Sequence, residues 1–568
     1  MTTDVTVRRL SVTARPGDGS PDAGRIDRLL RGVADHRLEQ AVRAAGLPSG
    51  IWCLRRLDVP VRLDPARPDS ALEAAWAAAL VAALRRAMEE GSPDAVRYAD
   101  ERAAVLDLVC STACGRTERG WAWRQVGLIH AAAPAPERAP GAAILAVLRR
   151  CAGQAPGIVT TAAGRVGLPA LHRALGAVGW EDVAESVRRT LDAPALANFR
   201  TTSTTSVEAA VLADALLVGS RLAGHIGRSG LRPADSTLDA WALLVVAETD
   251  ASALHRSTAK EILGAVARVL TGSRSPGPPG GAPAPDLPAT ADGKTDPAAA
   301  VRPSRGPEPQ RAAGGFTAED PPLLEPTSTA SVTAAVVSGP ESDSGPGQPN
   351  AWAGLSAGSA ADTRSRAEPV SAMPVTAPVE NGAEPDPEAG QSTVWAGLLF
   401  LLATAPAAGI PAAVLDDPLF AARPLPWVLQ GIALSLLPTA CTDPAVAAFA
   451  GADPEARAPW ERGPVATPAE RDRITELADG WAAVTTTALG GYDAPPREAV
   501  TSDDGPDRDP RDVVTAFARR NGHIHYAPGW TEAHLAADEV DVSVRRAGLD
   551  LDPGWVPWLG TVVRFVYV

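Results

Sequence analysis

The chain has 568 residues, of which 45% are hydrophobic and only 4% aromatic, and its formal net charge is −14. This acidic balance argues against a nucleic-acid-binding protein, which needs a basic surface. No run of about eighteen apolar residues occurs, which argues against a membrane span. The length predicts about three or four domains.

The cysteines and the first residues of the chain bear on the cellular compartment in which the protein is expected. The five cysteines are odd in number and scattered, which fits a reducing environment better than a disulfide scaffold. No apolar segment follows the first methionine, so we expect no signal peptide. Together these features predict a cytoplasmic protein.

Residues 1–92 alternate between strand and helix patterns and predict an N-terminal β-α-β-α unit. The strands are expected at 5–14 and 51–63, with a helix at 23–45 between them. The second helix is expected to begin with a capping box made by Ser70 and Glu73. Its buried stripe has helical spacing and comprises Leu72, Trp76, Leu80, Leu84 and Met88.

Residues 93–270 are rich in Ala, Leu and Val and predict a helical domain. The expected helices are separated by Gly, Pro and Ser, and they lie near 94–114, 141–151, 168–191, 206–224, 236–248 and 251–271. Residues 271–392 are rich in Pro, Gly and Ala and contain only two aromatic residues, Phe316 and Trp352. Such a segment cannot bury enough apolar surface to offset its ordering entropy, so we predict a disordered linker.

Residues 393–568 predict a C-terminal helical domain that ends in strands. Helices are expected at 394–410, 425–438, 467–488 and 510–520. Strands are expected at 523–527 and 540–546, followed by a closing strand in TVVRFVYV. The predicted fold class is therefore α+β and mainly helical, with a terminal β-hairpin and strand in a small antiparallel sheet.

Two short motifs satisfy part of a catalytic pattern but lack its structural context. The only glycine-lysine-threonine sequence, at 293–295 within Asp292–Thr295, fails as a phosphate-binding loop because Pro288 stands where a glycine is required. Gly354–Gly358 satisfies G-x-S-x-G, but no apolar strand precedes it and it lies in the predicted linker. The aspartate pairs at 416–417 and 550–552 are explained by turn formation. We therefore expect neither catalytic residues nor a cofactor.

Metal binding has two weak candidates. Cys110 and Cys114 lie one helical turn apart without a second cysteine pair, so buried packing is the favoured interpretation. His523 and His525 alternate along a predicted strand near His534, and three imidazoles could hold a metal. Exposed histidines on a hairpin are the commoner outcome, so we assign no metal site.

The last fourteen residues hold four of the chain's few aromatic side chains. Trp555 and Trp558 flank Pro557, and the closing strand carries Phe565 and Tyr567. That strand is apolar on both faces and needs cover on both sides. It is either buried in its own domain, paired with 523–527 or 540–546, or docked onto a partner protein. The hypothetical partner-docking site therefore comprises Trp555, Pro557, Trp558, Phe565 and Tyr567.

The same segment resembles the C-terminal signature of contractile injection system tape measure proteins, which belong to extracellular phage-tail-like particles. The matching residues are Arg546–Asp550, Pro553–Trp555, Pro557–Trp558 and the extended end at 562–567. LRRLDVPVRL (54–63) and VWAGLLFLL (394–402) are similar to other parts of the family. The resemblance implies a structural assembly role without catalysis, and partners among tube, baseplate and sheath proteins.

The chain lacks the long helical rod that a molecular ruler requires. A ruler needs a long continuous rod, and the chain has no uninterrupted heptad region. A two-ended assembly protein therefore fits at least as well as a literal tape measure. The alternatives are a cytoplasmic two-domain adaptor or regulator unrelated to tails, and an effector associated with the particle.

Overall fold

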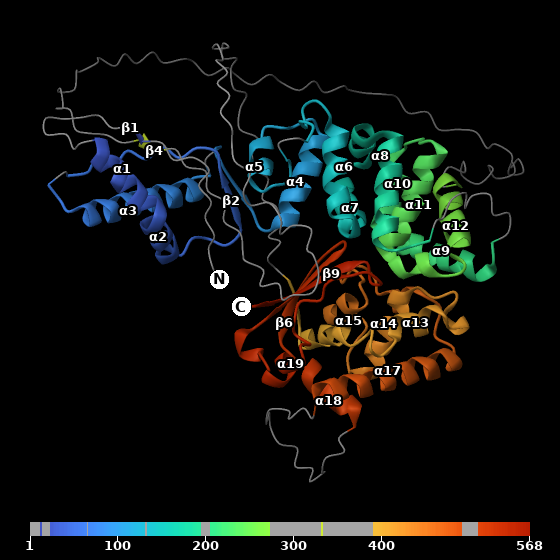
Figure 1. Ribbon diagram of the computed structural model, residues 1–568. Coiled ribbons are helices and arrows are strands. Elements are labelled where there is room, and N and C mark those ends of the chain that lie inside the picture. Colours follow the sequence, from blue (N-terminus) through green and yellow to red (C-terminus); the bar gives the residue numbers. More distant parts are fainter. Residues whose placement is uncertain are drawn as a thin grey trace, which may run out of the picture.

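The computed structural model describes residues 23–64, 66–91, 93–130, 133–194, 205–272, 390–490 and 509–568, and the backbone of 12–13 and 331–332. Their fold confirms the predicted class, α+β and mainly helical (Figure 1). The predicted linker, 271–392, lies almost entirely outside the described residues. Of the predicted strand 5–14, only β1 (Val12–Thr13) is described, and it pairs antiparallel with β4 (Ser331–Val332).

The N-terminal unit is built from helices around a small core of its own. Helix α1 (Ala23–Gly32) continues through a π-helical turn (Val33–Arg37) into α2 (Leu38–Ala45), as the predicted helix at 23–45 requires. Helix α3 (Asp69–Glu89) buries all five residues of the predicted stripe. The predicted capping box is wrong, because the helix begins at Asp69, two residues earlier than a Ser70 N-cap would place its start. Pro68 occupies the N-cap position and makes no side-chain hydrogen bond.

A two-stranded ribbon connects this unit to the helical region. Strand β2 (Ile51–Leu54) pairs antiparallel with β3 (Ala95–Tyr98), so the helix predicted at 94–114 is wrong for its first residues. Successive side chains of a strand point to opposite faces. Ile51, Cys53, Val96 and Tyr98 therefore enter the core of the helical region, whereas Trp52 and Leu54 enter the N-terminal core.

Residues 95–272, hereafter the helical half, form one core of packed helices. Its elements after β3 are α4 (Glu101–Ala113), α5 (Gly120–Gln125), α6 (Pro140–Arg150), a 3₁₀ turn η2 (Ala152–Gln154), α7 (Ala155–Val166), α8 (Leu168–Thr190), α9 (Val207–Gly219), α10 (Arg221–Ser229), α11 (Asp235–Thr249), η4 (Ala251–His255) and α12 (Ala259–Gly272). The helix predicted at 206–224 is broken at Ser220, whose side chain caps α10. Helices α5 and α7 were not predicted.

Residues 390–568, hereafter the C-terminal half, form a second core. Its helical elements are η5 (Ala396–Ala403), α13 (Ile410–Leu415), η6 (Pro418–Phe420), α14 (Leu425–Leu436), α15 (Pro444–Phe449), α16 (Pro459–Arg462), α17 (Pro468–Leu489), α18 (Pro510–Ala518), η7 (Ala537–Glu539) and α19 (Val542–Arg546). The buried helix predicted at 394–410 is in fact a 3₁₀ helix, η5, that ends at Ala403; turns follow it, and α13 begins at Ile410. The strand predicted at 540–546 is wrong, because Asp541 caps α19 there by accepting the backbone N–H groups of Ser543 and Val544.

A five-stranded sheet completes the C-terminal half. Its strands are β5 (Gln391–Thr393), β6 (Gly522–Ala527), β7 (Trp530–Leu535), β8 (Gly554–Val556) and β9 (Thr561–Tyr567), in the order β5-β6-β7-β9-β8. The strand predicted at 523–527 is present as β6, but its hairpin partner is β7, which was not predicted, and not residues 540–546. Strand β9 pairs parallel with β7 and antiparallel with β8, so the sheet is mixed rather than antiparallel. The closing strand therefore has neither of the two partners that the sequence predicts.

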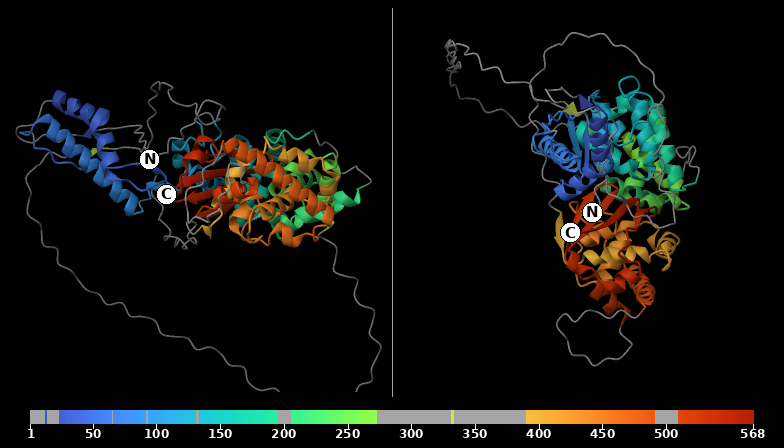
Figure 2. Two further views of the ribbon diagram at one scale, coloured as in Figure 1. Left: turned by 90° about the horizontal axis from the view of Figure 1, so that it is seen from below. Right: turned by 60° about the vertical axis from the view of Figure 1, so that its left-hand side comes forward.

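The sheet lies between the helices of the two halves. Figure 1 shows β9 and β6 between α6–α12 on one side and α13–α18 on the other, and Figure 2 shows the same stacking from a second direction. This arrangement covers both faces of the closing strand, as its apolar pattern requires. No single described helix is long and apolar enough to cross a bilayer; two bent pairs, Pro140–Arg150 with Ala152–Val166 and Val207–Gly219 with Arg221–Ser229, satisfy the length and composition only when taken together.

Candidate functional site: the seam between the two halves

One of the predicted docking residues, Trp555, lies where the two halves meet, a surface that we call the seam. Trp555 pairs with Val562 across β8 and β9 and packs against the core of the helical half. Trp558, three residues later, packs against the core of the C-terminal half. The two indoles around Pro557 therefore serve the two different halves, and the docking surface that Trp555 fills belongs to the same chain.

Glycines allow close approach across the seam. The ring of Trp555 lies against Gly153, where an added Cβ would stand 2.7–3.0 Å from three ring atoms. A Cβ on Gly157 in α7 would overlap the carbonyl oxygen of Pro528, in the β6–β7 turn. Such distances are far below van der Waals contact, so neither position can carry a larger residue without separating the halves.

A carboxylate of the helical half caps a helix of the C-terminal half. Asp250 is 3% exposed. One of its oxygens accepts the backbone N–H of Ala253 and the hydroxyl of Ser252 within η4. The other, Oδ2, accepts the backbone N–H of Leu425 at 2.8 Å, at the start of α14. The first N–H groups of a helix have no partner inside it, so α14 depends on the other half for this hydrogen bond.

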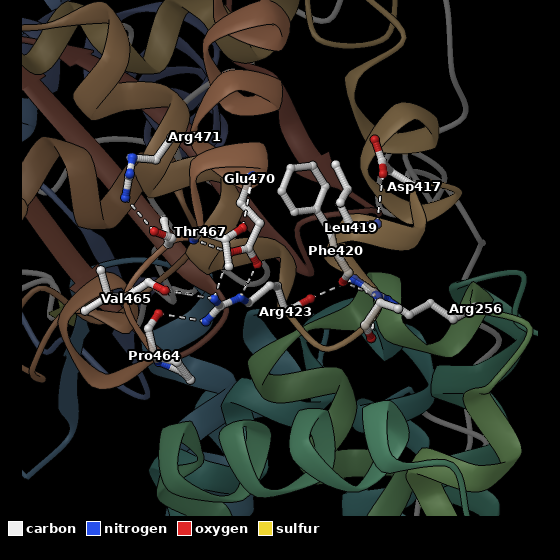
Figure 3. Close-up of polar contacts among 12 residues, drawn as sticks. Arg256, Asp417, Leu419, Phe420, Arg423, Pro464, Val465, Thr467, Glu470 and Arg471 are labelled. Atoms are coloured by element: carbon white, nitrogen blue, oxygen red, sulfur yellow. Dashed lines mark hydrogen bonds and ion pairs between the residues drawn. The ribbon is translucent and has the colours of Figure 1, made fainter.

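A buried guanidinium makes a second polar connection beside Asp250. Arg256 Nη1 donates to the carbonyl oxygens of Phe420 at 2.9 Å and Ala421 at 3.2 Å, and its Nη2 donates to that of Arg423 at 2.9 Å (Figure 3). Burial lowers the pKa of Arg256, and the charge of Asp250 opposes that shift. The segment from η6 to the start of α14 is thus held by two charged side chains of the helical half. Asp250 accepts a backbone N–H from it, and Arg256 donates to its carbonyl oxygens.

The same loop is tied to α17 within the C-terminal half. Arg423 forms a bidentate ion pair with Glu470, with Nε–Oε1 at 2.7 Å and Nη2–Oε2 at 3.0 Å (Figure 3). Its guanidinium also lies over the ring of Trp427. Glu470 also completes the capping box of α17 with Thr467. Burial alone would raise the pKa of Glu470, but the hydrogen bonds from Arg423 and Thr467 outweigh it, and the pKa is lowered. Arg256 therefore contacts a rigid loop.

A third group of contacts lies around the break between α9 and α10. Arg221 forms an ion pair with Asp453 across the seam. Glu248 on α11 accepts the hydroxyl of Ser220 and the backbone N–H of Leu222, which lies 3.2 and 3.3 Å from its two oxygens.

The carboxyl of Glu248 has a pKa well above the ordinary value for glutamate. Burial raises the pKa of Glu248 to about 7, although these hydrogen bonds and Arg221 oppose the shift. Burial and the charge of Glu248 raise the pKa of Tyr526, from β6 of the other half, to about 12. The protonation of Glu248 is thus coupled to residues on both sides of the seam.

The other predicted docking residues are structural parts of the C-terminal half. Phe565 packs edge-on against Phe400, with ring centroids 4.9 Å apart. The hydroxyl of Tyr567 donates to Asp550 Oδ2 at 3.1 Å, and Arg545 donates to the same oxygen at 3.1 Å. Asp550 is 3% exposed, so it is a buried anchor for the closing strand rather than only a turn residue.

The metal candidates are placed as follows. The rings of His525 and His534 lie 4.1 Å apart, His534 contacts Glu532 at 3.0 Å, and His523 is exposed opposite His534. Within the described ranges, no group of three or more His, Cys, Asp or Glu side chains is placed to hold a metal ion. Cys110 is buried in the helical core, as predicted, and burial raises its pKa to about 11, whereas Cys114 is exposed.

Comparison of the chain with known protein families, with curated protein sequences and with solved structures finds no match.

Proposed function

We propose that the protein is a non-enzymatic structural or assembly component of a contractile, phage-tail-like injection particle. The observation that carries the proposal is the position of the block at 546–567. The residues that resemble the C-terminal signature of the tape measure family include strands β8 and β9, and within this block Trp555 and Gly560 contact the helical half. Part of the signature thus lies at a contact between two folded surfaces, which is a feature expected of an assembly component.

The backbone of the block supports this interpretation. Gly548, Gly554 and Gly560 have φ values of +71°, +65° and +69°, a region that other residues rarely adopt. These turns bring Asp550 under Tyr567 and direct Trp555 into the helical half. A Gly/Trp/Pro/Asp pattern of this kind is accounted for by shape and packing alone.

The helices favour a two-ended assembly role over a literal ruler. Helix α8 has 23 residues, about 35 Å of rod, and is interrupted by non-helical geometry at Gly176. Two separately cored bodies that meet at a fitted seam are better suited to joining components, such as the tube and the baseplate, than to measuring a length.

Affinity capture of the tagged full-length chain from cells that produce the particles tests the proposal. Recovery of tube, baseplate or sheath subunits supports it, and recovery only of unrelated signalling proteins supports the adaptor alternative. Truncation of 547–568 is a poor test, because it removes β8 and β9 from the sheet. The capture therefore uses the intact chain.

A further inference from the structure

We propose that the seam also forms between two copies of the chain, so that the helical half of one copy binds the C-terminal half of a second copy in the same geometry. The partner is a second copy of this protein, and the surface is the seam described above. This inference concerns how copies join each other and does not require the proposed function.

Each half has the core of an independent body. One cluster of buried apolar residues lies between Ile51 and Leu270, and another lies between Trp395 and Phe565. Among the described residues of the C-terminal half, Trp555 is the apolar side chain that packs against the first cluster. Other contacts across the seam include ion pairs, hydrogen bonds and close glycine approaches. This composition is that of an interface between two folded proteins rather than of one continuous core.

The polar contacts are specific enough to define one docking geometry. Arg102 donates to the carbonyl of Pro528 at 2.9 Å, and Arg462 donates to the carbonyl of Val218 at 3.2 Å. Together with the Asp250 and Arg256 contacts, these hydrogen bonds join the two halves at several separate places along the seam. A second copy presents the same donors and acceptors in the same positions, so it meets every contact that the first copy makes.

The covalent connection does not determine which copy supplies each half. The stretch between Gly272 and Gly390 has 117 residues (273–389), which can span roughly 390 Å at full extension. A folded body of the size of the two halves together has a radius of gyration of about 20 Å. A tether of that length gives an effective concentration of at most about a millimolar. Pairing within one copy therefore dominates in dilute solution, and exchange between copies competes where many copies gather.

A cleaved full-length protein tests the inference. A specific protease site is inserted after Gly345, and two preparations, one with an N-terminal tag and one with a C-terminal tag, are purified and cleaved. We expect each cleaved preparation to elute as a 1:1 complex of its two fragments at micromolar concentration. The two preparations are mixed equally and incubated a few degrees below the unfolding midpoint. Capture on the N-terminal tag should then recover C-terminally tagged fragments, which approach half of the captured C-terminal fragments.

Two matched variants test whether the fragments bind each other through the seam. Gly157→Ala inserts a methyl group into the seam, whereas Gly164→Ala lies on the same helix, is exposed and meets only ordinary contacts with His225. Gly157→Ala should make the fragments separate at a concentration at least 30-fold higher than Gly164→Ala does. Fragments of the unmodified sequence that separate at micromolar concentration overturn the inference. Fragments that stay together but never form the mixed complex overturn it as well.

Discussion

A methyl group at Gly157 should open the seam, although alanine is a better helix former than glycine. Gly157→Ala in α7 gains up to about 1 kcal/mol of helix propensity. The new Cβ overlaps the carbonyl oxygen of Pro528, which is backbone and cannot rotate away. Overpacking of this kind costs about 1–3 kcal/mol. The hydrogen bond from Arg102 to the same oxygen, worth about 1.5–3 kcal/mol, is lost when the surfaces separate. The gain in helix propensity is the same in the docked and the separated states, so the cost to docking is the sum of the other two, at least about 2.5 kcal/mol.

Hydrogen exchange at Leu425 measures that cost. The backbone N–H of Leu425 donates to Asp250 of the other half, so this amide is protected only while the halves are docked. A cost of at least about 2.5 kcal/mol corresponds to exchange that is at least about 70-fold faster. Gly164→Ala, on the same helix but away from the seam, should leave the rate at Leu425 unchanged or lower it. Equal exchange rates at Leu425 in the two variants would refute the reasoning.

Three further predictions concern the polar contacts of the seam. Asp250→Ala removes the carboxylate that accepts the Leu425 amide and should lower the free energy of unfolding by about 1–2 kcal/mol, measured by urea denaturation; an unchanged midpoint would contradict this. Arg256→Met leaves three carbonyl oxygens without their donor and should cost about 3 kcal/mol or more, and Arg256→Lys should recover only part of that loss. The pKa of Glu248 is about 7 in the folded protein and 4.5 in the reference state, so the folded state binds the proton more tightly. Stability should therefore be greatest below about pH 4.5 with respect to this group, fall as the pH rises to about 7, and then level off; denaturation of Glu248→Gln across this range should show a smaller decrease, and an identical decrease would contradict the assignment.

The fold was predictable wherever the pattern was local. The stripe from Leu72 to Met88 repeats at helical spacing and is buried in α3 as expected. The strand predicted at 540–546 failed because Val540 and Val542 are exposed and only Val544 is buried, so the alternation did not reflect a buried face. Asp541, an N-cap residue followed by a short apolar run, carried the signal for the helix instead.

The seam was less predictable, because its contacts join residues that lie far apart in the sequence. The sequence singled out Trp555 as a docking residue, and the structure places it at the seam against Gly153. It gave no sign of Asp250 or Arg256, whose partners lie about 170 residues away. A charged residue that caps a distant helix leaves no periodic pattern around itself, so only the three-dimensional arrangement identifies it.

Electron microscopy of particles from cells that lack this gene tests the central claim, an assembly role, most directly. If the protein helps to assemble a contractile particle, the deletion should give no particles or particles of abnormal length. A plasmid copy carrying the unmodified sequence or Gly164→Ala should restore normal particles. Particles of normal number and length in the deletion strain would contradict the assembly role.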